Sequence, residues 1–172
     1  MLARPESGEF LEYYGRYIDQ VPNRPVLDTL EEQRDTMRSV LGHLPPDRAG
    51  YRYAPDKWTI ADVVLHLSDA ERIFAYRALR IARGDETPLA SWDENAYAAQ
   101  TDTSRLSIPV LLDDWEAARA STLSLFRTFD HDMWTRRGTA SGHTITPRAL
   151  AYIVAGHTAH HLSILQERYG VK

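Results

Sequence analysis

Apolar residues recur at spacings of three and four along most of this chain, and this period constrains its fold more than any other feature of the sequence. Such spacing places the apolar side chains on one face of an α-helix. Four long stretches carry it, over about residues 26–44, 59–84, 107–129 and 146–169. Signals for strands are nearly absent. Because four amphipathic helices bury their faces most simply against one another, the sequence predicts an all-α protein, built as a four-helix bundle.

Local signals mark the ends of the predicted helices. Thr59 and Asp62 have the spacing of a capping box at the start of the second stretch. The fourth stretch begins with Thr146 as a predicted N-cap and Pro147 in the first helical position. The first stretch stops at Pro45-Pro46, because proline cannot continue a helix.

The segment before the bundle has an aromatic pattern of its own. Tyr13, Tyr14 and Tyr17 fall within a predicted short helix over residues 9–21, packed on the outside of the bundle. We therefore predict an N-terminal extension over residues 1–25 and one bundle domain over residues 26–172. The connections 85–106 and 130–145 are long for a bundle, and such loops are often functional or contain short elements.

Charge and cysteine content exclude several classes of protein. The 172 residues carry a formal net charge of -4, so the chain lacks the basic face that nucleic-acid binding requires. No apolar run approaches the roughly 18 to 20 residues that span a bilayer, and the start has no signal-peptide pattern. We predict no membrane association and, by default, a cytoplasmic location.

The sequence has no cysteine, so a transition-metal site would have to be built from histidine.

Two histidines lie in the middle of an apolar helix face. In the fourth stretch this face runs through Ile153, Val154, His157, His161 and Ile164. A buried imidazole without a partner is costly, and a pair four residues apart on a helix can point at one metal ion. A pair of hydrogen-bonded core histidines is an equally good interpretation of this spacing alone.

A third ligand would have to come from another helix, and His66 lies on the apolar face of the second stretch. Three imidazoles would leave coordination positions for water or substrate, which is the pattern of catalytic metal sites. The chain has neither the His-Glu-x-x-His motif of zinc proteases nor the Glu-x-x-His motif of di-iron bundles. His160 borders the same face. We interpret the remaining histidines as surface residues: His43, His131 and His143.

The residues around these histidines resemble the DinB-like superfamily. The resemblance is carried by residues 58–71, which lead into and past His66, and by residues 156–169, which contain His157 and His161. It extends over about residues 26–170. It implies up-down-down-up connectivity and a divalent metal ion, zinc or nickel, held by His66, His157 and His161. It also implies a small-molecule substrate and a homodimer.

We consider three candidate functions, of which the first two follow from known activities in this superfamily. The first is a metal-dependent S-transferase, in which the ion binds and deprotonates a low-molecular-weight thiol that reaches the cysteine-free protein as a cosubstrate. The second is a metal-dependent hydrolase. The third is a non-catalytic binding or stress-response module that its metal stabilises.

Hydrolysis requires an acid or base near the ion. The candidates are His160, Glu71 and Asp62. Each has a simpler interpretation: His160 only borders the apolar face, Glu71 pairs with an arginine, and Asp62 completes the capping box. Three residues of the 85–106 connection are predicted substrate contacts, although core or dimer packing is an equally good interpretation of the two aromatic ones: Trp92, Asn95 and Tyr97.

Overall fold

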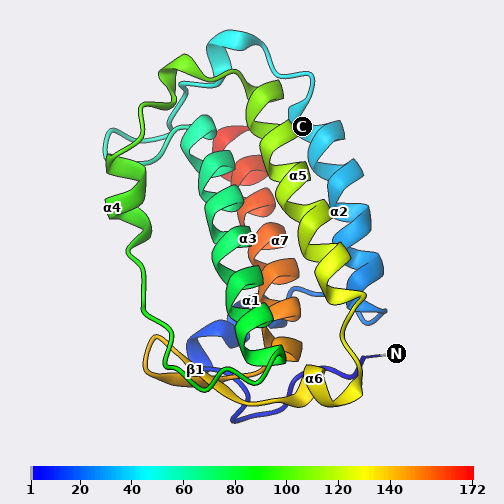
Figure 1. Cartoon of the computed structure of the whole chain (residues 1–172). Coiled ribbons are helices and arrows are strands. Elements are labelled where there is room, and N and C mark those ends of the chain that lie inside the picture. The colour runs from blue at the N-terminus through cyan, green and yellow to red at the C-terminus, as the bar shows by residue number, and fades with distance from the viewer. Residues whose placement is uncertain (1) are drawn as a thin grey trace.

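Four long helices build the molecule. The computed structural model describes residues 2–172. The bundle contains α2 (Val26–Leu41), α3 (Ile60–Ala82), α5 (Ile108–Phe126) and α7 (Pro147–Tyr169). In Figure 1, α2 and α7 run upward while α3 and α5 run downward, so the connectivity is up-down-down-up. The predicted all-α four-helix bundle is confirmed, and each helix lies within the stretch predicted for it.

The two helices that carry the clustered histidines have well-defined starts. At α3 the Thr59 hydroxyl accepts a hydrogen bond from the backbone N–H of Asp62 at 3.1 Å, and the Asp62 carboxylate accepts one from the backbone N–H of Thr59 at 2.9 Å. This is the predicted capping box. At α7 the Thr146 hydroxyl accepts from the N–H of Ala149 at 3.1 Å. Gly170 ends α7 with a φ of 67°, which glycine adopts without strain.

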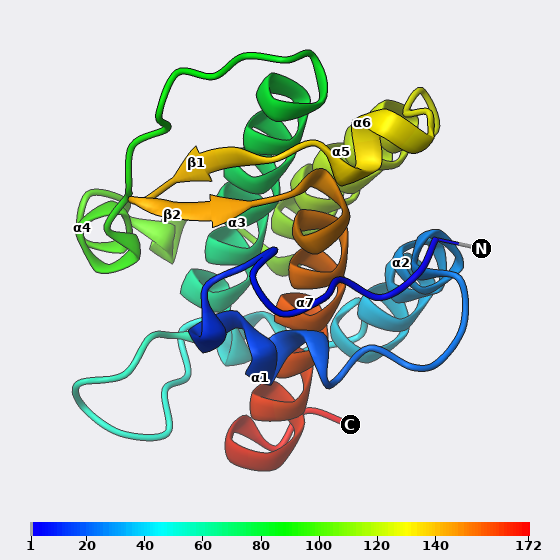
Figure 2. The ribbon, with the colours of Figure 1, turned by 90° about the horizontal axis from the view of Figure 1, so that it is seen from below.

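The four helices pack as a ring. In this ring α2 contacts α5, α5 contacts α3, α3 contacts α7, and α7 contacts α2. Figure 2 shows the same arrangement from below, with α7 between α3 and α2. The long connection that follows α3 returns along the outside of the bundle before α5 begins, as Figure 1 shows. This return is what allows α3 and α5 to run in the same direction.

A polar layer divides the apolar core into two parts. One buried cluster contains Leu30 of α2, Phe74 of α3 and Phe126 of α5. The other contains Met37 of α2 and Trp115 of α5. Between them every helix of the bundle contributes a buried polar side chain: Gln33 on α2, His66 and Glu71 on α3, Arg119 on α5, and His157 and Thr158 on α7. The candidate functional residues therefore lie at mid-height in the bundle.

The N-terminal segment is less helical than predicted. A turn η1 (Glu12–Tyr14) and a short α1 (Gly15–Ile18) replace the helix predicted over residues 9–21. Contacts with the start of α7 compete with helix formation, because the backbone carbonyl of Glu9 accepts a hydrogen bond from the N–H of Thr146 at 3.2 Å. The buried Glu9 carboxylate also accepts hydrogen bonds from the side chains of Thr146 and Arg148. The segment α1 packs on the outside of α7, as Figures 1 and 2 show.

Both long connections contain short elements. The first holds α4 (Glu94–Ala99) and η3 (Thr103–Arg105), and the second holds α6 (His131–Thr135) and the strands β1 (Gly138–Ala140) and β2 (His143–Ile145). The strands form an antiparallel hairpin through Ser141 and Gly142, whose φ angles of 52° and 79° fit a type I′ turn. A turn η2 (Pro46–Arg48) lies between α2 and α3. None of the helices within residues 2–172 is long and apolar enough to cross a membrane.

Candidate metal centre

Three histidines from two helices meet in the polar layer. His66 lies on α3, and His157 and His161 lie one turn apart on α7. The Nε2 atom of His157 is 3.1 Å from the Nε2 atom of His66 and 3.1 Å from that of His161. All three ligand atoms lie within 4.8 Å of one another. The structure therefore brings together the three residues that the sequence grouped.

The spacing of these nitrogens fits a shared cation. A neutral ring nitrogen carries either one N–H or one lone pair, so the Nε2 atom of His157 cannot make a normal hydrogen bond with both neighbours. Imidazole nitrogens that bind one zinc ion at 2.0–2.1 Å in tetrahedral geometry lie roughly 3.3 Å apart. The observed separations of 3.1 Å are close to that value. Within residues 2–172 the group contains these three ligands and no carboxylate.

Burial keeps the three imidazoles neutral. Desolvation lowers the pKa of His66 to about 4 and the pKa of His161 to about 3. Desolvation, with the neighbouring histidines, holds the pKa of His157 well below its ordinary value. Because a metal binds the lone pair of the neutral ring, few protons compete for these nitrogens at pH 7.

Aromatic rings surround the imidazoles. The ring of Trp58 lies 4.8 Å from that of His66, and the ring of Trp92 stacks on His66 at 5.8 Å with an interplanar angle of 14°. On the other side, the ring of Tyr17 stands edge-on to that of His157 at 5.3 Å. The buried Nδ1 atom of His161 has no hydrogen-bond partner in the described chain. Packing against these rings therefore contributes strongly to the orientation of the imidazoles.

Two spaces adjoin the histidines. A cavity of about 260 Å³ is lined by His161 together with Trp58, Asn95 and other residues. A recess of about 10 Å³, close to the volume that one water needs, lies against His66 and is bordered by Asp69 and Glu94. Burial raises the pKa values of both carboxyl groups. The centre therefore has room for a small molecule on one side and carboxylates on the other.

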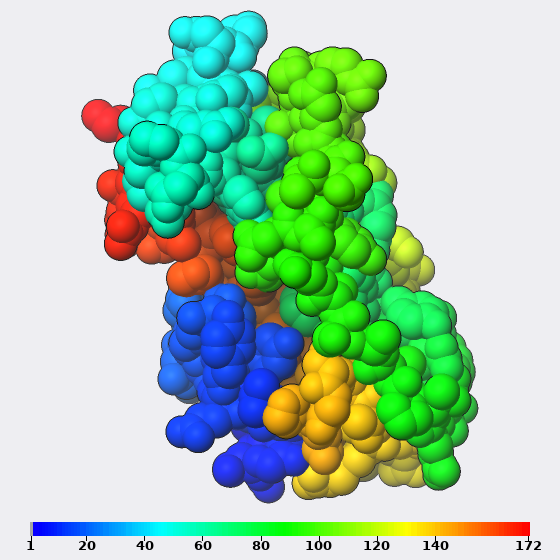
Figure 3. All heavy atoms as spheres, turned by 90° about the vertical axis from the view of Figure 1, so that its left-hand side faces the viewer, coloured from blue at the N-terminus to red at the C-terminus, as the bar shows by residue number. Residues whose placement is uncertain are grey.

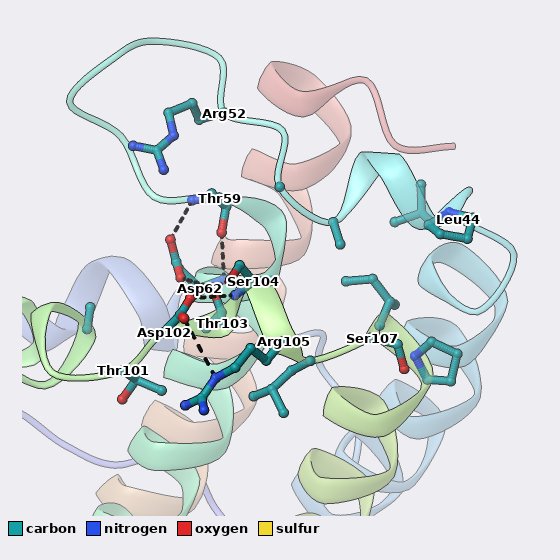
Figure 4. A pocket seen from close by; sticks show the side chains of 18 residues that line it. Leu44, Arg52, Thr59, Asp62, Thr101, Asp102, Thr103, Ser104, Arg105 and Ser107 are labelled. Atoms are coloured by element: carbon teal, nitrogen blue, oxygen red, sulfur yellow. Dashed lines mark hydrogen bonds and ion pairs between the residues drawn. The ribbon is translucent and has the colours of Figure 1, made fainter.

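A larger cavity, of about 830 Å³, lies where α3 and α5 begin (Figure 4). Its lining includes Arg52, Ser104 and Arg105, and none of the three histidines. Asp62 and Thr103 line both this cavity and the recess beside His66, and the Thr103 hydroxyl donates to the Asp62 carboxylate at 2.5 Å. This hydrogen-bonded pair therefore lies between the two spaces.

The predicted substrate contacts are near the histidines to different degrees. Trp92 stacks directly on His66, and Asn95 lines the cavity beside His161. Tyr97 is 50% exposed and packs on Trp92, with ring centroids 5.2 Å apart. Tyr97 therefore lies one residue further from the centre, and its contact with Trp92 is the packing role that the sequence also allowed.

The structure distinguishes the three candidate acids and bases by their hydrogen-bond partners. Both oxygens of the buried Glu71 carboxylate accept hydrogen bonds from Arg119, at 2.8 and 2.9 Å, so Glu71 is the partner of an arginine. Asp62 caps α3 and accepts from Thr103. His160 is half-buried, and its ring lies 5.4 Å from that of His161. His160 is thus the candidate that remains beside the centre without a strong competing interaction.

Several residues near the centre were not singled out from the sequence as site residues. They are Tyr17 on α1, Trp58 before α3, Asp69 on α3 and Glu94 on α4. Asp69 lies three residues after His66, so helical spacing could have pointed to it. Tyr17 and Glu94 reach the centre only through tertiary packing of short segments. His43, His131 and His143 are exposed, as predicted.

The fold and these histidines define a class: an up-down-down-up helical bundle with three convergent imidazoles at mid-height. The profile of the DinB superfamily matches residues 29–165, and the chain belongs to that superfamily. The resemblance stated from the sequence is confirmed. A search of curated protein sequences gave no match.

Solved structures share the fold. YfiT from Bacillus subtilis, described as a probable metal-dependent hydrolase with an unusual four-helix bundle topology, matches with a TM-score of 0.75 and 20% identity, over 99% of this chain and 95% of that one. A mycothiol-dependent maleylpyruvate isomerase matches with a TM-score of 0.67 and 17% identity, over 84% of this chain and 61% of that one. A mutant of that isomerase matches with a TM-score of 0.69 and 16% identity, over 90% and 63%. At these identities the matches establish the fold alone.

Proposed function

We propose that His66, His157 and His161 bind a divalent cation, zinc or nickel, and that the protein is a metal-dependent enzyme that transfers a small thiol to an electrophilic substrate. The observation that carries this proposal is the convergence of three neutral Nε2 atoms beside a cavity of about 260 Å³. A cation bound there would act as a Lewis acid, lowering the pKa of a thiol or water that enters its remaining coordination positions. The description of one structural relative as mycothiol-dependent supports the choice of a thiol.

The protein's own residues would bind and orient the reactants. Trp58 and Asn95 border the cavity beside His161 and would position the substrate there. Trp92 covers His66 and would limit access of water from that side. The half-buried His160 would accept the proton that the thiol releases, because burial, followed by the charge of Arg16, lowers its pKa and leaves its ring neutral.

Metal analysis tests the centre. Purified protein should contain about one equivalent of zinc or nickel, and His157→Ala should lose nearly all of it. His43→Ala is the matched control, because His43 is exposed and lies outside the cluster. Equal metal content in the wild type and His157→Ala would reject the assignment of the ligands.

Turnover tests the reaction. The metal-loaded protein should conjugate a low-molecular-weight thiol to an electrophile, and His157→Ala should lose this activity by several orders of magnitude. The panel should include mycothiol, glutathione and cysteine as thiols. Absence of turnover across the panel, with the metal content verified, would contradict the thiol proposal.

Hydrolysis is the second candidate, and the recess beside His66 favours it. That recess has the volume of about one water and is bordered by Asp69 and Glu94, whose raised pKa values suit proton transfer. The description of YfiT as a probable hydrolase agrees with this alternative.

A thiol-free assay tests the hydrolase alternative. If it is correct, the metal-loaded protein should cleave activated esters or amides without thiol, and Glu94→Gln should reduce kcat. Under the thiol proposal, Glu94→Gln should leave thiol transfer nearly unchanged.

A further inference from the structure

The N-terminal segment brings a cationic side chain to the candidate metal centre. Arg16 lies on α1, outside the residues matched by the family profile. It directly precedes Tyr17, whose ring centroid lies 5.3 Å from that of His157 and 5.2 Å from that of His160. Figure 3 shows α1 and the segment around α4 on either side of an exposed part of α7. Arg16 therefore belongs to the surroundings of the three histidines.

Two tyrosines hold the guanidinium of Arg16 in place. Its Nη2 atom donates hydrogen bonds to the hydroxyl of Tyr17, at 2.7 Å, and to that of Tyr13. Its central carbon lies 3.9 Å from the ring centroid of Tyr13 and 4.7 Å from that of Tyr17. The Tyr17 ring in turn stands edge-on to His157 and His160. These contacts reduce the rotamer freedom that an exposed arginine otherwise has.

Arg16 forms no direct ion pair with a carboxylate of the described residues, and its charge acts on Glu94 only through space. By contrast, Arg38, Arg72 and Arg119 each have one or two carboxylate partners. Its Nε and Nη1 atoms also lack a hydrogen-bond acceptor within the described chain, since only Nη2 is engaged. A positioned guanidinium with free N–H groups is suited to bind a carboxylate in a bidentate manner.

We propose that Arg16 binds a carboxylate of a small molecule that reacts at the three-histidine centre, so that the natural substrates of this protein include a carboxylic acid. The inference rests on the proposed function, because it requires a ligand at that centre. The carboxylate can belong to the thiol or to the electrophile. In either case Arg16 determines which substrates bind at the centre.

The thiol arm of the test uses protein loaded with cobalt(II), whose visible absorption changes when a ligand binds. The probes are 3-mercaptopropionate and its neutral isostere 3-mercaptopropionamide. If the thiol carries the carboxylate, the wild type should bind the acid at least about tenfold more tightly, as expected for one charge-assisted hydrogen-bonded pair. Arg16→Gln should bind both thiols equally, with the Kd of the amide unchanged, and Arg16→Lys should keep part of the preference.

The acceptor arm uses 3-mercaptopropionamide as the thiol, with iodoacetate and iodoacetamide as matched electrophiles. In this reaction the sulfur–carbon bond forms, the carbon–iodine bond breaks, iodide leaves with the bonding electrons, and the thiol proton passes to His160 and from there to solvent. If the acceptor carries the carboxylate, kcat/KM should favour iodoacetate over iodoacetamide after correction for the uncatalysed rates. Arg16→Gln should abolish this preference through KM, so that the two electrophiles have equal KM values.

Arg52→Gln is the control, because it removes the same charge from an exposed arginine that lines the other cavity. It should retain any preference that Arg16→Gln loses. No preference for the charged probe in either arm, or the same preference in Arg16→Gln, would overturn the proposal.

The thiol function can fail independently of the role of Arg16. If neither thiol changes the cobalt spectrum, the thiol function is wrong. Titration with succinate and succinamide then decides the role of Arg16 separately: equal binding of the two in the wild type would overturn it.

Discussion

At the scale of single residues, burial dominates the chemistry of the three imidazoles. Desolvation is the largest cause of the lowered pKa values of His66, His157 and His161. A lowered histidine pKa means that protons compete with a metal only at lower pH. The buried site should therefore keep its metal at lower pH than a site built from exposed histidines.

The first prediction concerns that range. Because the pKa values of His66 and His161 fall to about 4 and about 3, metal affinity should change little from pH 8 to about 5 and decrease steeply below about pH 4. Exposed histidines, with pKa values near 6.5, would begin to release the metal about two pH units higher. Competition with a chromophoric chelator at each pH measures the affinity, and a midpoint near pH 6.5 would contradict the prediction.

The grouping of the three histidines could be predicted because helical spacing is local. His157 and His161 share a face since they are four residues apart, and His66 was recognisable from the apolar residues around it. Tyr17, Glu94 and Arg16 approach the same centre from segments whose conformation depends on tertiary contacts. No local period encodes such contacts, so these residues required the structure.

At the scale of elements, the contact between α1 and α7 depends on Gly156. A Cβ atom at this position would lie 1.9 Å from the backbone carbonyl oxygen of Tyr17. A backbone atom cannot rotate away as a side chain can, so α1 would have to move as a unit. The same glycine precedes His157, which places this close approach beside the candidate ligands.

The second prediction is that Gly156→Ala displaces α1 and destabilises the protein, by roughly 1 to 3 kcal/mol as for other overpacked sites. Gly50→Ala is the control, since no atom lies within 4 Å of a Cβ at that position. Urea unfolding followed by circular dichroism measures both. Equal free energies of unfolding for the two variants would contradict the prediction, because they would mean that α1 can move without destabilising the protein.

The elements that the sequence did not predict correctly are short, and their conformation depends on neighbouring segments. The hairpin of β1 and β2 has strands of three residues, too short for a period of two to be visible, and its turn uses Ser141-Gly142. The predicted helix over residues 9–21 is shortened because Glu9 interacts with Thr146 and Arg148. Long, strongly periodic helices could be predicted, and short elements that depend on neighbours could not.

At the scale of the whole molecule, one buried arginine links all four helices of the bundle. Arg119 on α5 donates to both oxygens of Glu71 on α3, to the Leu30 carbonyl and the Gln33 side chain on α2, and to the Thr158 hydroxyl on α7. All five of its N–H groups thus have acceptors. Since both charges are buried, removal of one leaves the other without compensation.

The third prediction follows from this network. Arg119→Met should reduce the free energy of unfolding by about 3 to 5 kcal/mol, and the double variant with Glu71→Leu should recover much of the loss. The control is Arg72→Met, which breaks an exposed pair with Asp114 and should cost less than about 1 kcal/mol. Chemical denaturation measures all three variants, and similar losses in Arg119→Met and Arg72→Met would contradict the prediction.

The fourth prediction concerns removal of the metal. Two apolar clusters lie on either side of the polar layer and do not depend on a cation, so metal-free protein should keep its helical circular dichroism. A metal present at 100 times its Kd stabilises by about 2.7 kcal/mol, which for a chain of this size raises Tm by roughly 5 to 10 °C. Thermal melts with and without chelator measure this shift. Unfolding at room temperature on chelation would instead support the non-catalytic, metal-stabilised module.

The ring order of the helices has a consequence for cooperativity. The contacts run from α2 to α5, from α5 to α3, from α3 to α7 and from α7 back to α2, so each of these interfaces joins the first half of the chain to the second. The two helices of each half, α2 with α3 and α5 with α7, lie diagonally across the bundle. Neither half has an interior of its own, and each would expose its apolar faces if expressed alone. The two halves must interleave in a single event, and His66 meets His157 and His161 only when they do.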